Sequence, residues 1–161
     1  PTDSSTDVGP LARRVLRDQL HYQVVRSRDD GATVATGGRP IDGPGDFYEP
    51  TVLTDVTPGM PAFDKELFGP VASLITASSE TEAVELANDS PYGLGAAIFT
   101  EDRERGEELA LELEAGSTFV NGLVKSDPRL PFGGVKESGY GRELARWGIR
   151  EFTNVKTVWI G

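Results

Sequence analysis

The sequence predicts an α/β fold built around a mostly parallel sheet. Three observations support this class. Short apolar segments alternate along the chain with amphipathic segments long enough to be helices, a pattern typical of βαβ crossovers. Glycine and proline clusters separate these segments, as connecting turns require. With 161 residues, 37% of them hydrophobic, the chain is long enough to bury the core of one compact domain.

The N-terminal region, residues 6–32, predicts one long amphipathic helix. Its apolar residues recur at helical spacing at Leu11, Val15, Leu16, Leu20 and Val24. Pro10 suits the first helical turn, and Gly31 suits the exit. His21, the single histidine, lies among polar neighbours in this helix, which favours a solvent-facing residue over a metal ligand.

The next region predicts extended segments separated by a loop. Residues 33–38 alternate briefly between polar and apolar and stop at paired glycines. Residues 39–46 predict a loop from their Gly, Pro and Asp content, and residues 47–56 predict an extended segment interrupted by Pro50. Residues 71–77, VASLITA, then predict a short buried strand.

The alternation of strands and helices is clearest in the second half of the chain. It predicts a helix, a strand, a charged helix and a strand over residues 80–89, 95–100, 102–115 and 117–121. Ser79 and Glu82 form a capping-box pattern for the first of these helices. In the charged helix, Leu109 and Leu113 lie on one face, and the acidic residues form a solvated face.

Residues 131–148 predict a Gly-rich loop that leads into a short helix. The segment GYGREL fits only the first two glycines of GxGxxG, has Leu144 at the third, and follows a loop instead of a strand. A tight connection whose glycines permit positive φ is therefore favoured over a phosphate-binding loop. Residues 155–160 predict an apolar terminal strand, which needs a partner.

The composition argues against several classes of function. The net charge of −10, from 26 acidic and 16 basic residues, disfavours a nucleic-acid or anionic-membrane partner, because phosphate contacts need clustered Lys and Arg. The absence of cysteine excludes disulfides, thiolate metal sites and a cysteine nucleophile. The sequence shows no transmembrane run and no signal-peptide pattern, so we expect a cytoplasmic protein.

Glu66 and Phe68 are the first candidate binding residues, and they precede Gly69, Pro70 and the predicted strand 71–77. One interpretation is an exposed acid at a turn, held by Phe68 and Pro70 docking into the core. The other is a carboxylate at the mouth of a strand that accepts hydrogen bonds from a sugar diol, with the phenyl ring packing on the ligand, as at nucleotide sites of α/β proteins. The motif alone leaves both interpretations open.

Ser126 is the next candidate, in the segment VKSDPRLPFGG. It is either a turn residue before Asp127 and Pro128 or a hydroxyl presented to a ligand, and the spacing favours the turn. No serine lies in a GxSxG elbow, and no GxxxxGKS/T phosphate loop occurs. The residues alone therefore indicate an α/β domain with a candidate ligand-binding edge and without a catalytic or metal-ligating set.

Six segments occur in an order that closely resembles the C-terminal third of the aldehyde dehydrogenase superfamily: FYEPTVLTDV, PGMPAFDKELFGPV, ANDSPYGLGAAIFT, AGSTFVNG, PFGGVKESGYGRE and GIREFTNVKTVWI. The resemblance extends from about Asp7 to Ile160. Within the superfamily, VKSDPRLPFGGVKESGYGREL is most similar to the succinate-semialdehyde dehydrogenase group. The resemblance implies an aldehyde dehydrogenase-like partial catalytic domain over residues 1–145 and a C-terminal tail, 146–161, with an oligomerisation strand.

The resemblance also implies roles for the candidate residues. Glu66 matches the Glu that accepts hydrogen bonds from the nicotinamide ribose of NAD or NADP, and Phe68 matches the Phe beside the nicotinamide. Ser126 matches a loop Ser that helps to hold the substrate carboxylate, and Phe132 would line the aldehyde tunnel. The strand 155–160 would pair with a neighbouring subunit, which implies a homo-oligomer.

The same resemblance implies that this chain carries no catalytic residues of its own. The chemistry of the family needs a cysteine thiolate, oxyanion donors and a Glu base, all of which precede the matching region. We therefore expect the full-length parent to oxidise a small aldehyde, succinate semialdehyde, to succinate with NAD or NADP. We expect this chain alone to be inactive.

Two other readings of the chain remain open. A short gene product could retain this part of the fold as a non-catalytic interaction or assembly module. The chain starts at Pro1 and its only methionine is Met60, which fits either a trimmed initiator or a segment of a longer chain. The related acyl-phosphate reductases share the fold, but ELFGPV together with PFGGVKESGYGRE is closer to the aldehyde dehydrogenases.

Overall fold

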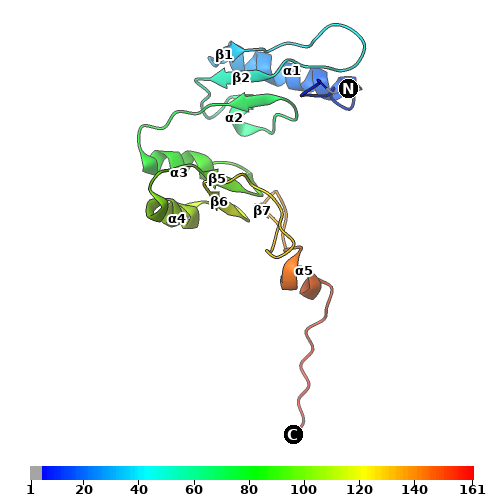
Figure 1. The fold of residues 1–161 in the computed structure, drawn as a ribbon, viewed down its shortest axis with the longest axis vertical. Helices are drawn as coiled ribbons and strands as arrows, with labels where there is room; N and C mark the ends of the chain where they lie inside the picture. Colours follow the sequence, from blue (N-terminus) through cyan, green and yellow to red (C-terminus); the bar gives the residue numbers. More distant parts are fainter. Residues whose placement is uncertain (1–4) are drawn as a thin grey trace. The chain divides into compact units, whose positions relative to one another are not determined.

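The computed structural model describes residues 5–161, and the chain divides into two compact units, Pro1–Ala77 and Ser78–Gly161 (Figure 1). Each sheet is formed by the strands of one unit, which accounts for this division. This division by contacts does not test the boundary predicted after residue 145, which separates a partial catalytic domain from an oligomerisation tail. That functional boundary stays a prediction.

Among its described residues, the first unit contains two helices and three strands. In chain order they are α1 (Arg14–Asp29), β1 (Thr33–Thr36), β2 (Thr51–Thr54), α2 (Pro61–Asp64) and β3 (Val71–Ser73). Strand β2 lies in the middle of the sheet, with β1 antiparallel and β3 parallel to it. The predicted loop connects β1 to β2, and α2 lies between β2 and β3.

Helix α1 confirms the predicted N-terminal helix, but its predicted start is wrong: Pro10 and Leu11 precede the helix, because the backbone is still extended at the N-cap residue Arg13. Its buried residues are Leu20, Gln23, Val24 and Ser27, which follow the spacing of one helical face. The helix ends at Asp29, and Gly31 has a φ of +121°, a conformation that favours glycine. Val15 was predicted on the apolar face but is 63% exposed, because it lies near the first turn, before the buried stripe begins.

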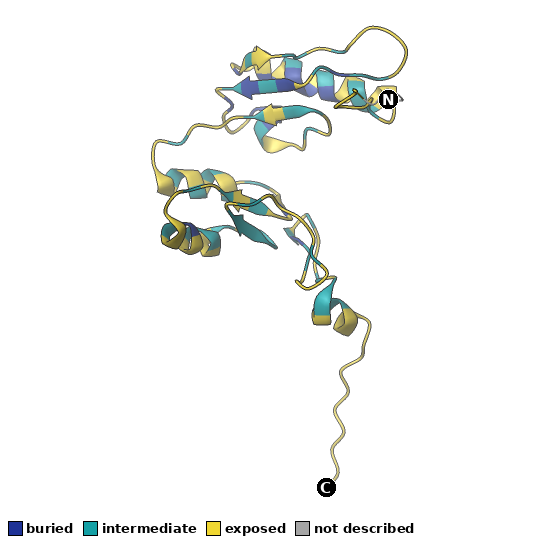
Figure 2. Ribbon diagram, viewed as in Figure 1, coloured by how far each residue is buried: buried dark blue, intermediate teal, exposed yellow. Residues whose placement is uncertain are grey.

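The buried apolar side chains among residues 5–161 all lie in the first unit. They are Leu20, Val24, Ala32, Tyr48, Leu53, Val56, Met60 and Ala62, and they form one cluster. Figure 2 shows the buried residues along α1 and β2. In β2, Thr51 and Leu53 are buried and the residues between and after them are half-buried, so the strand presents one face to the core.

The buried strand predicted over residues 71–77 is shorter and more exposed than expected. Only Val71–Ser73 form β3, while Leu74 and Ile75 are 53% and 38% exposed. Strand β3 lies at the edge of its sheet, so it lacks the second neighbour that would bury it. The apolar pattern of this segment therefore does not correspond to burial within the first unit.

The second unit, all of which the structure describes, contains three helices and four short strands. They are α3 (Glu80–Asn88), β4 (Tyr92–Gly93), β5 (Ala96–Ile98), α4 (Arg103–Glu112), β6 (Thr118–Val120), β7 (Val135–Lys136) and α5 (Ala145–Glu151). Strand β5 pairs with β6 in parallel, and α4 connects them. This arrangement confirms the βαβ crossover predicted from the alternating pattern, and α5 confirms the short helix after the Gly-rich loop.

The strand pairing is less parallel than predicted. Two of the four pairings among residues 5–161 are parallel, namely β2 with β3 and β5 with β6. The other two are antiparallel. The reason is that β1 and β2 are joined by a returning loop, and that β7, a two-residue strand inside the predicted Gly-rich loop, returns to pair with β4.

The N-terminus of α3 contains half of the predicted capping box. The Ser79 hydroxyl accepts a hydrogen bond from the Glu82 N–H at 3.2 Å, as predicted. In a complete capping box, the Glu82 carboxylate would accept a hydrogen bond from the Ser79 N–H. Here it accepts instead from the N–H of the preceding residue, Ser78, at 2.6 Å. That carboxylate also accepts from the Ser78 hydroxyl, and these bonds lower the pKa of Glu82 below its usual value.

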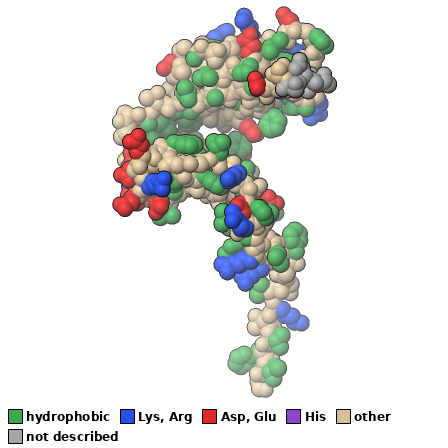
Figure 3. All heavy atoms as spheres, viewed as in Figure 1, with side chains coloured by type: hydrophobic (Ala, Val, Ile, Leu, Met, Phe, Trp, Pro, Cys, Tyr) green, Lys and Arg blue, Asp and Glu red, His purple; other side chains and the backbone are tan. Residues whose placement is uncertain are grey.

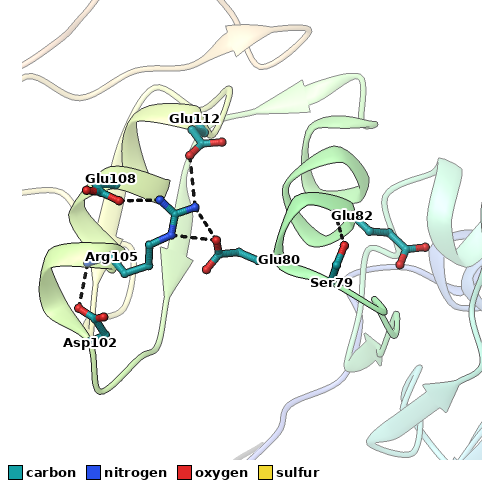
Figure 4. A network of polar contacts seen from close by, with 7 residues as sticks. All are labelled: Ser79, Glu80, Glu82, Asp102, Arg105, Glu108 and Glu112. Carbon is teal, nitrogen blue, oxygen red and sulfur yellow. Dashed lines mark hydrogen bonds and ion pairs between the residues drawn. The ribbon is translucent and has the colours of Figure 1, made fainter.

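Ion pairs around Arg105 connect α3 to α4. The guanidinium contacts the carboxylates of Glu80 on α3 and of Glu108 and Glu112 on α4 (Figure 4). The Arg105–Glu108 pair is 2.6 Å long, and the Arg105–Glu112 pair is 3.8 Å long. The hydrogen bond from Arg105 is the main reason that the pKa of Glu80 lies below its ordinary value.

The buried residues of the second unit are all glycines, namely Gly93, Gly106 and Gly134. Figure 2 shows the unit as half-buried and exposed almost throughout. Leu109 and Leu113, the predicted apolar face of α4, line a hollow of about 230 Å³ together with residues of α3 and β5. The second unit is therefore folded by strand pairing and surface contacts without a closed apolar core.

The residues after α5 form no strand. The exposed fraction is 95% for Val155 and 87% for Ile160, and Figure 3 shows hydrophobic side chains along this terminal segment. The strand predicted over 155–160 is therefore not formed within this chain, because a strand needs a hydrogen-bonded neighbour. Its pairing with another subunit stays a prediction.

Candidate functional site

The loop that carries Glu66 and Phe68 is attached to α1 by a buried polar side chain. The Gln23 amide donates a hydrogen bond to the backbone carbonyl of Glu66 at 3.1 Å, and Gln23 is only 6% exposed. A buried amide that has one partner in the loop fixes the position of the backbone there. Gln23 was not identified from the sequence, although its polar side chain falls at the spacing of the core-facing residues of α1.

The Gly-Pro pair allows the loop to approach α1 closely. A Cβ atom at Gly69 would lie 2.4 Å from the Leu20 Cδ2 atom, a distance that real contacts do not reach. Directly after it, the Pro70 carbonyl accepts a hydrogen bond from the Thr51 N–H at 2.8 Å, which starts the pairing of β3 with β2. A larger residue at position 69 would have to displace the buried Leu20 side chain, and the loop is held at both of its ends.

The side chains of Glu66 and Phe68 point away from the core. Glu66 is exposed, and its carboxylate has no hydrogen bond or ion pair among the residues that the structure describes. Phe68 is 66% exposed, so the interpretation in which its ring docks into the core is wrong. Rigid backbone and exposed side chains are the combination expected at a binding loop.

Phe68 lines an apolar hollow of about 470 Å³ in the first unit. The remaining wall comes from residues 8–12, Leu16 and the neighbouring residues of 67–70, and none of these side chains is charged. The hollow is large enough for an aromatic ring system, and the exposed carboxylate of Glu66 lies two residues along the chain. The hollow offers an apolar surface to a ring-shaped ligand beside Phe68.

A second polar residue of α1 holds the segment before the loop. The Ser27 hydroxyl accepts a hydrogen bond from the Ala62 N–H at 2.9 Å, and both residues are buried. The Ser73 hydroxyl donates to the carbonyl of the same residue, Ala62, at 3.0 Å. The backbone groups of α2 are thus paired with side chains of α1 and β3, which again fixes the approach to Glu66.

Ser126 is exposed and directly precedes a tight turn, as its spacing predicted. The turn is closed by the Leu130 N–H, which donates to the Asp127 carbonyl at 2.9 Å. The Arg129 guanidinium contacts both oxygens of the Asp127 carboxylate, at 2.9 and 2.6 Å. These bonds and the Arg129 N–H hold the pKa of Asp127 well below its usual range.

Phe132 is half-buried and belongs to a two-residue bridge. Its N–H donates to the Glu143 carbonyl at 2.9 Å, and the Glu143 N–H donates to the Phe132 carbonyl at 2.7 Å. The Gly-rich loop between them has positive φ at Gly139 and Gly141, as predicted for a tight connection. The loop is therefore closed on itself, with the Phe132 backbone at its base.

The structure groups the four candidate residues in pairs, one pair in each unit. Glu66 and Phe68 share a loop of the first unit, and Ser126 and Phe132 lie six residues apart in the second. The prediction that His21 faces solvent is wrong. His21 is half-buried, because its Nδ1 atom lies 3.0 Å from the hydroxyl of Tyr48 and forms a hydrogen bond with it.

Within residues 5–161, no three His, Cys, Asp or Glu side chains converge as metal ligands. Over the same residues, no helix combines the length and the apolar character that crossing a membrane requires. The loop of Glu66 and Phe68 and the loop of Ser126 and Phe132 are therefore two candidate functional sites, one in each unit.

Comparisons with known proteins identify the family of this chain and leave the roles of the four candidate residues as predictions. The model of the aldehyde dehydrogenase family matches residues 1–158. The NADP(+) succinate-semialdehyde dehydrogenase 1 of Mycobacterium ulcerans is 50% identical over all of this chain and 35% of its own length. The NAD(P)+ succinate semialdehyde dehydrogenase Sad of Escherichia coli is 50% identical over 99% of this chain and 34% of its own length.

A solved structure gives the same result. Succinic semialdehyde dehydrogenase from Streptococcus pyogenes, in complex with NADP+, is 41% identical, with a TM-score of 0.92 over 98% of this chain and 35% of that one. The chain thus spans about a third of the length of the relatives that it matches. Its predicted place in the C-terminal third of a parent stays a prediction. The match to the family model over residues 1–158 shows that this chain belongs to the aldehyde dehydrogenase family.

Proposed function

We propose that this chain is a segment of an NAD(P)+-dependent aldehyde dehydrogenase that oxidises succinate semialdehyde to succinate. In that reaction the aldehyde carbon loses a hydride to NAD(P)+ and gains an oxygen atom from water. The observation that carries the proposal is the loop of Glu66 and Phe68, where a partner-free carboxylate precedes by two residues an exposed ring that lines an apolar hollow. The enzyme names of relatives at about 50% identity support the substrate.

Glu66 and Phe68 would bind the cofactor. The carboxylate of Glu66 is a strong acceptor for the two hydroxyls of a ribose, because charge-assisted hydrogen bonds are stronger than neutral ones. The ring of Phe68, with the apolar hollow beside it, provides a surface on which a nicotinamide can pack. The hydrogen bond from Gln23 and the packing of Gly69 would keep both side chains in place.

Ser126 and Phe132 would contact the substrate. The exposed Ser126 hydroxyl can donate a hydrogen bond to the terminal carboxylate of the semialdehyde. Phe132 would line the passage through which the aldehyde chain reaches the reacting carbon. Both roles rest on the match of these positions to the motifs of the succinate-semialdehyde dehydrogenase group.

We also propose that the residues here bind without carrying out the chemistry. The chain contains no cysteine, so it cannot form the covalent thiol adduct through which the family reacts. The nucleophile, its oxyanion donors and the general base would come from the remaining two thirds of the parent. The exposed segment 155–160 would pair with another subunit of that parent, and the parent would be cytoplasmic.

Substitution of Glu66 in the full-length parent tests the cofactor role. We expect Glu66→Gln to raise the KM for NAD(P)+ about tenfold, equivalent to ~1.4 kcal/mol, because an uncharged amide replaces the charged acceptor. The KM for the aldehyde should stay unchanged. The measurement is steady-state production of NAD(P)H, with this chain alone as a sample that should produce none.

Glu107→Gln is the matched control, since Glu107 is an exposed glutamate of α4 without a hydrogen bond or ion pair in the described residues. It should leave both KM values unchanged. An unchanged KM for NAD(P)+ in Glu66→Gln would contradict the cofactor role. Production of NAD(P)H by this chain alone would contradict the assignment of the chemistry to the rest of the parent.

A further inference from the structure

The backbone of Phe132 is bonded to residues 142–145, which we call the clamp segment. Phe132 and Glu143 exchange two N–H to carbonyl hydrogen bonds, at 2.9 and 2.7 Å. A bridge with both bonds made fixes the direction of the residue and of its Cβ. The direction in which the Phe132 ring leaves the loop therefore depends on the clamp segment.

The turn that follows Ser126 is bonded to the same segment. The Ala145 N–H donates to the Pro128 carbonyl at 3.2 Å. Pro128 is the second residue of the turn closed between Asp127 and Leu130. A shift of the clamp segment therefore moves both Phe132 and the turn that directly follows Ser126.

The side chain of Arg142 holds the clamp segment in place. Its Nη1 atom donates to the Gly134 carbonyl at 2.8 Å and to the Gly141 carbonyl at 2.7 Å. Gly134 is buried and Arg142 is half-buried, so these carbonyls depend on protein donors. One guanidinium thus connects the two sides of the Gly-rich loop, at Gly134 and at Gly141. The first of these sides begins at Phe132.

The clamp segment has an unfavourable backbone conformation. Leu144 has a φ of +64° and Ala145 a φ of +48°, values that residues with a Cβ rarely adopt. Such conformations persist where the surroundings fix them, and they are frequent at functional sites. Here the hydrogen bonds of Glu143 and Ala145 fix the backbone on both sides.

We propose that Arg142 is a positioning residue that selects the substrate through the clamp segment. By holding residues 142–145, it keeps Ser126 and Phe132 in the geometry that favours an aldehyde with a terminal carboxylate. The inference rests on the proposed function, which supplies the roles of those two residues. Arg142 is not a catalytic residue, because its guanidinium is bonded to backbone carbonyls of its own loop.

The test compares two aldehydes in the full-length parent, succinate semialdehyde and uncharged butanal. The readout is the ratio of their kcat/KM values, together with the KM for NAD(P)+. We expect Arg142→Gln to lower this ratio at least tenfold by raising the KM for the semialdehyde, with the KM for NAD(P)+ unchanged. Arg142→Lys keeps a charged donor and should restore part of the ratio.

Arg150→Gln is the matched control, since Arg150 is an exposed arginine of α5 whose side chain has no hydrogen bond or ion pair in the described residues. It should keep the wild-type ratio. Equal losses for both aldehydes in Arg142→Gln, or no loss, would overturn the proposal. If Arg142→Gln does not fold, Arg142→Lys provides the test. A kcat/KM ratio of the two aldehydes at least threefold below that of the wild type supports the proposal, and an unchanged ratio overturns it.

The wild-type parent separates this inference from the proposed function. A wild-type ratio at or below one means that succinate semialdehyde is not the substrate, and the proposed function fails. In that case the best aldehyde of the parent is compared with acetaldehyde, which is too short to reach Ser126 and Phe132. A lower ratio in Arg142→Gln then supports the positioning role, and an unchanged ratio overturns it.

Discussion

Tyr48 is the ionisable residue that the core of the first unit affects most. It is 2% exposed, and its hydroxyl is hydrogen-bonded to His21 on α1. Burial, and then the neighbouring charge of Glu49, raise the pKa of Tyr48 from 10.0 to about 12. The folded chain therefore keeps the neutral phenol at a pH at which the unfolded chain ionises it.

This shift predicts a loss of stability at alkaline pH. Below pH 10 Tyr48 is protonated in both states and adds no pH dependence. Between pH 10 and 12 the unfolded chain releases the proton and the folded chain retains it, so the free energy of unfolding falls as pH rises. Urea titrations of the chain at several pH values from 9 to 12 measure this slope.

Two variants isolate the contribution of Tyr48. Tyr48→Phe should show a flatter slope than the wild type above pH 10, because the titrating group is gone. Tyr140→Phe, at a fully exposed tyrosine, should keep the wild-type slope. Identical slopes in Tyr48→Phe and the wild type would show that the burial of this phenol does not control the alkaline response.

At the level of single residues, the sequence identified part of the candidate site. Glu66 and Phe68 could be chosen as candidates because a carboxylate and an aromatic residue before a Gly-Pro pair are visible in the chain, and their binding roles stay predictions. Gln23 and Ser27 were not, because their partners lie 43 and 35 residues away and only the packing of α1 brings them together. Arg142 was missed because its function depends on carbonyl groups, which have no signature in sequence.

At the scale of elements, the contact between α3 and α4 depends on Arg105. We expect Arg105→Gln to lower the melting temperature of the chain, since it removes the ion pairs with Glu80, Glu108 and Glu112. These groups are solvent-exposed, so salt should screen the pairs and reduce the difference from the wild type. Thermal unfolding at low and high salt measures both effects.

Arg103→Gln provides the comparison for Arg105. It removes the same charge from the same helix at an exposed residue without an ion pair in the described part of the chain. It should leave the melting temperature close to that of the wild type. A salt-independent loss in Arg105→Gln would mean that the side chain acts through packing instead of charge.

Elements with a local signal were predicted well. Helix α1, the cap at Ser79 and the βαβ crossover follow from spacing and capping residues, which act over a few positions. The antiparallel pairings and the exposure of residues 74–77 were not predicted. The direction of pairing and the exposure of a strand depend on which distant strand lies beside it. A run of apolar residues does not specify that partner.

At the scale of the whole molecule, the exposed segment 155–160 predicts assembly of the parent. We expect Val158→Asp to lower the molecular mass of the parent assembly in light scattering, because a buried charge disfavours an apolar strand interface. Asn154→Asp adds the same charge just outside the segment and should keep the assembly intact. An unchanged mass for Val158→Asp would argue against this interface.

The second unit, whose buried residues are all glycines, has a consequence for how its sequence varies. Its half-buried apolar residues, such as Phe119 and Leu109, belong to no closed core in this chain, so their size and shape should matter less for its stability than those of the buried residues of the first unit. In the parent that we propose, residues of its other two thirds would contact these positions and restrict their substitution. A library of variants selected for stability in this chain alone would therefore tolerate changes here that are harmful in the whole enzyme.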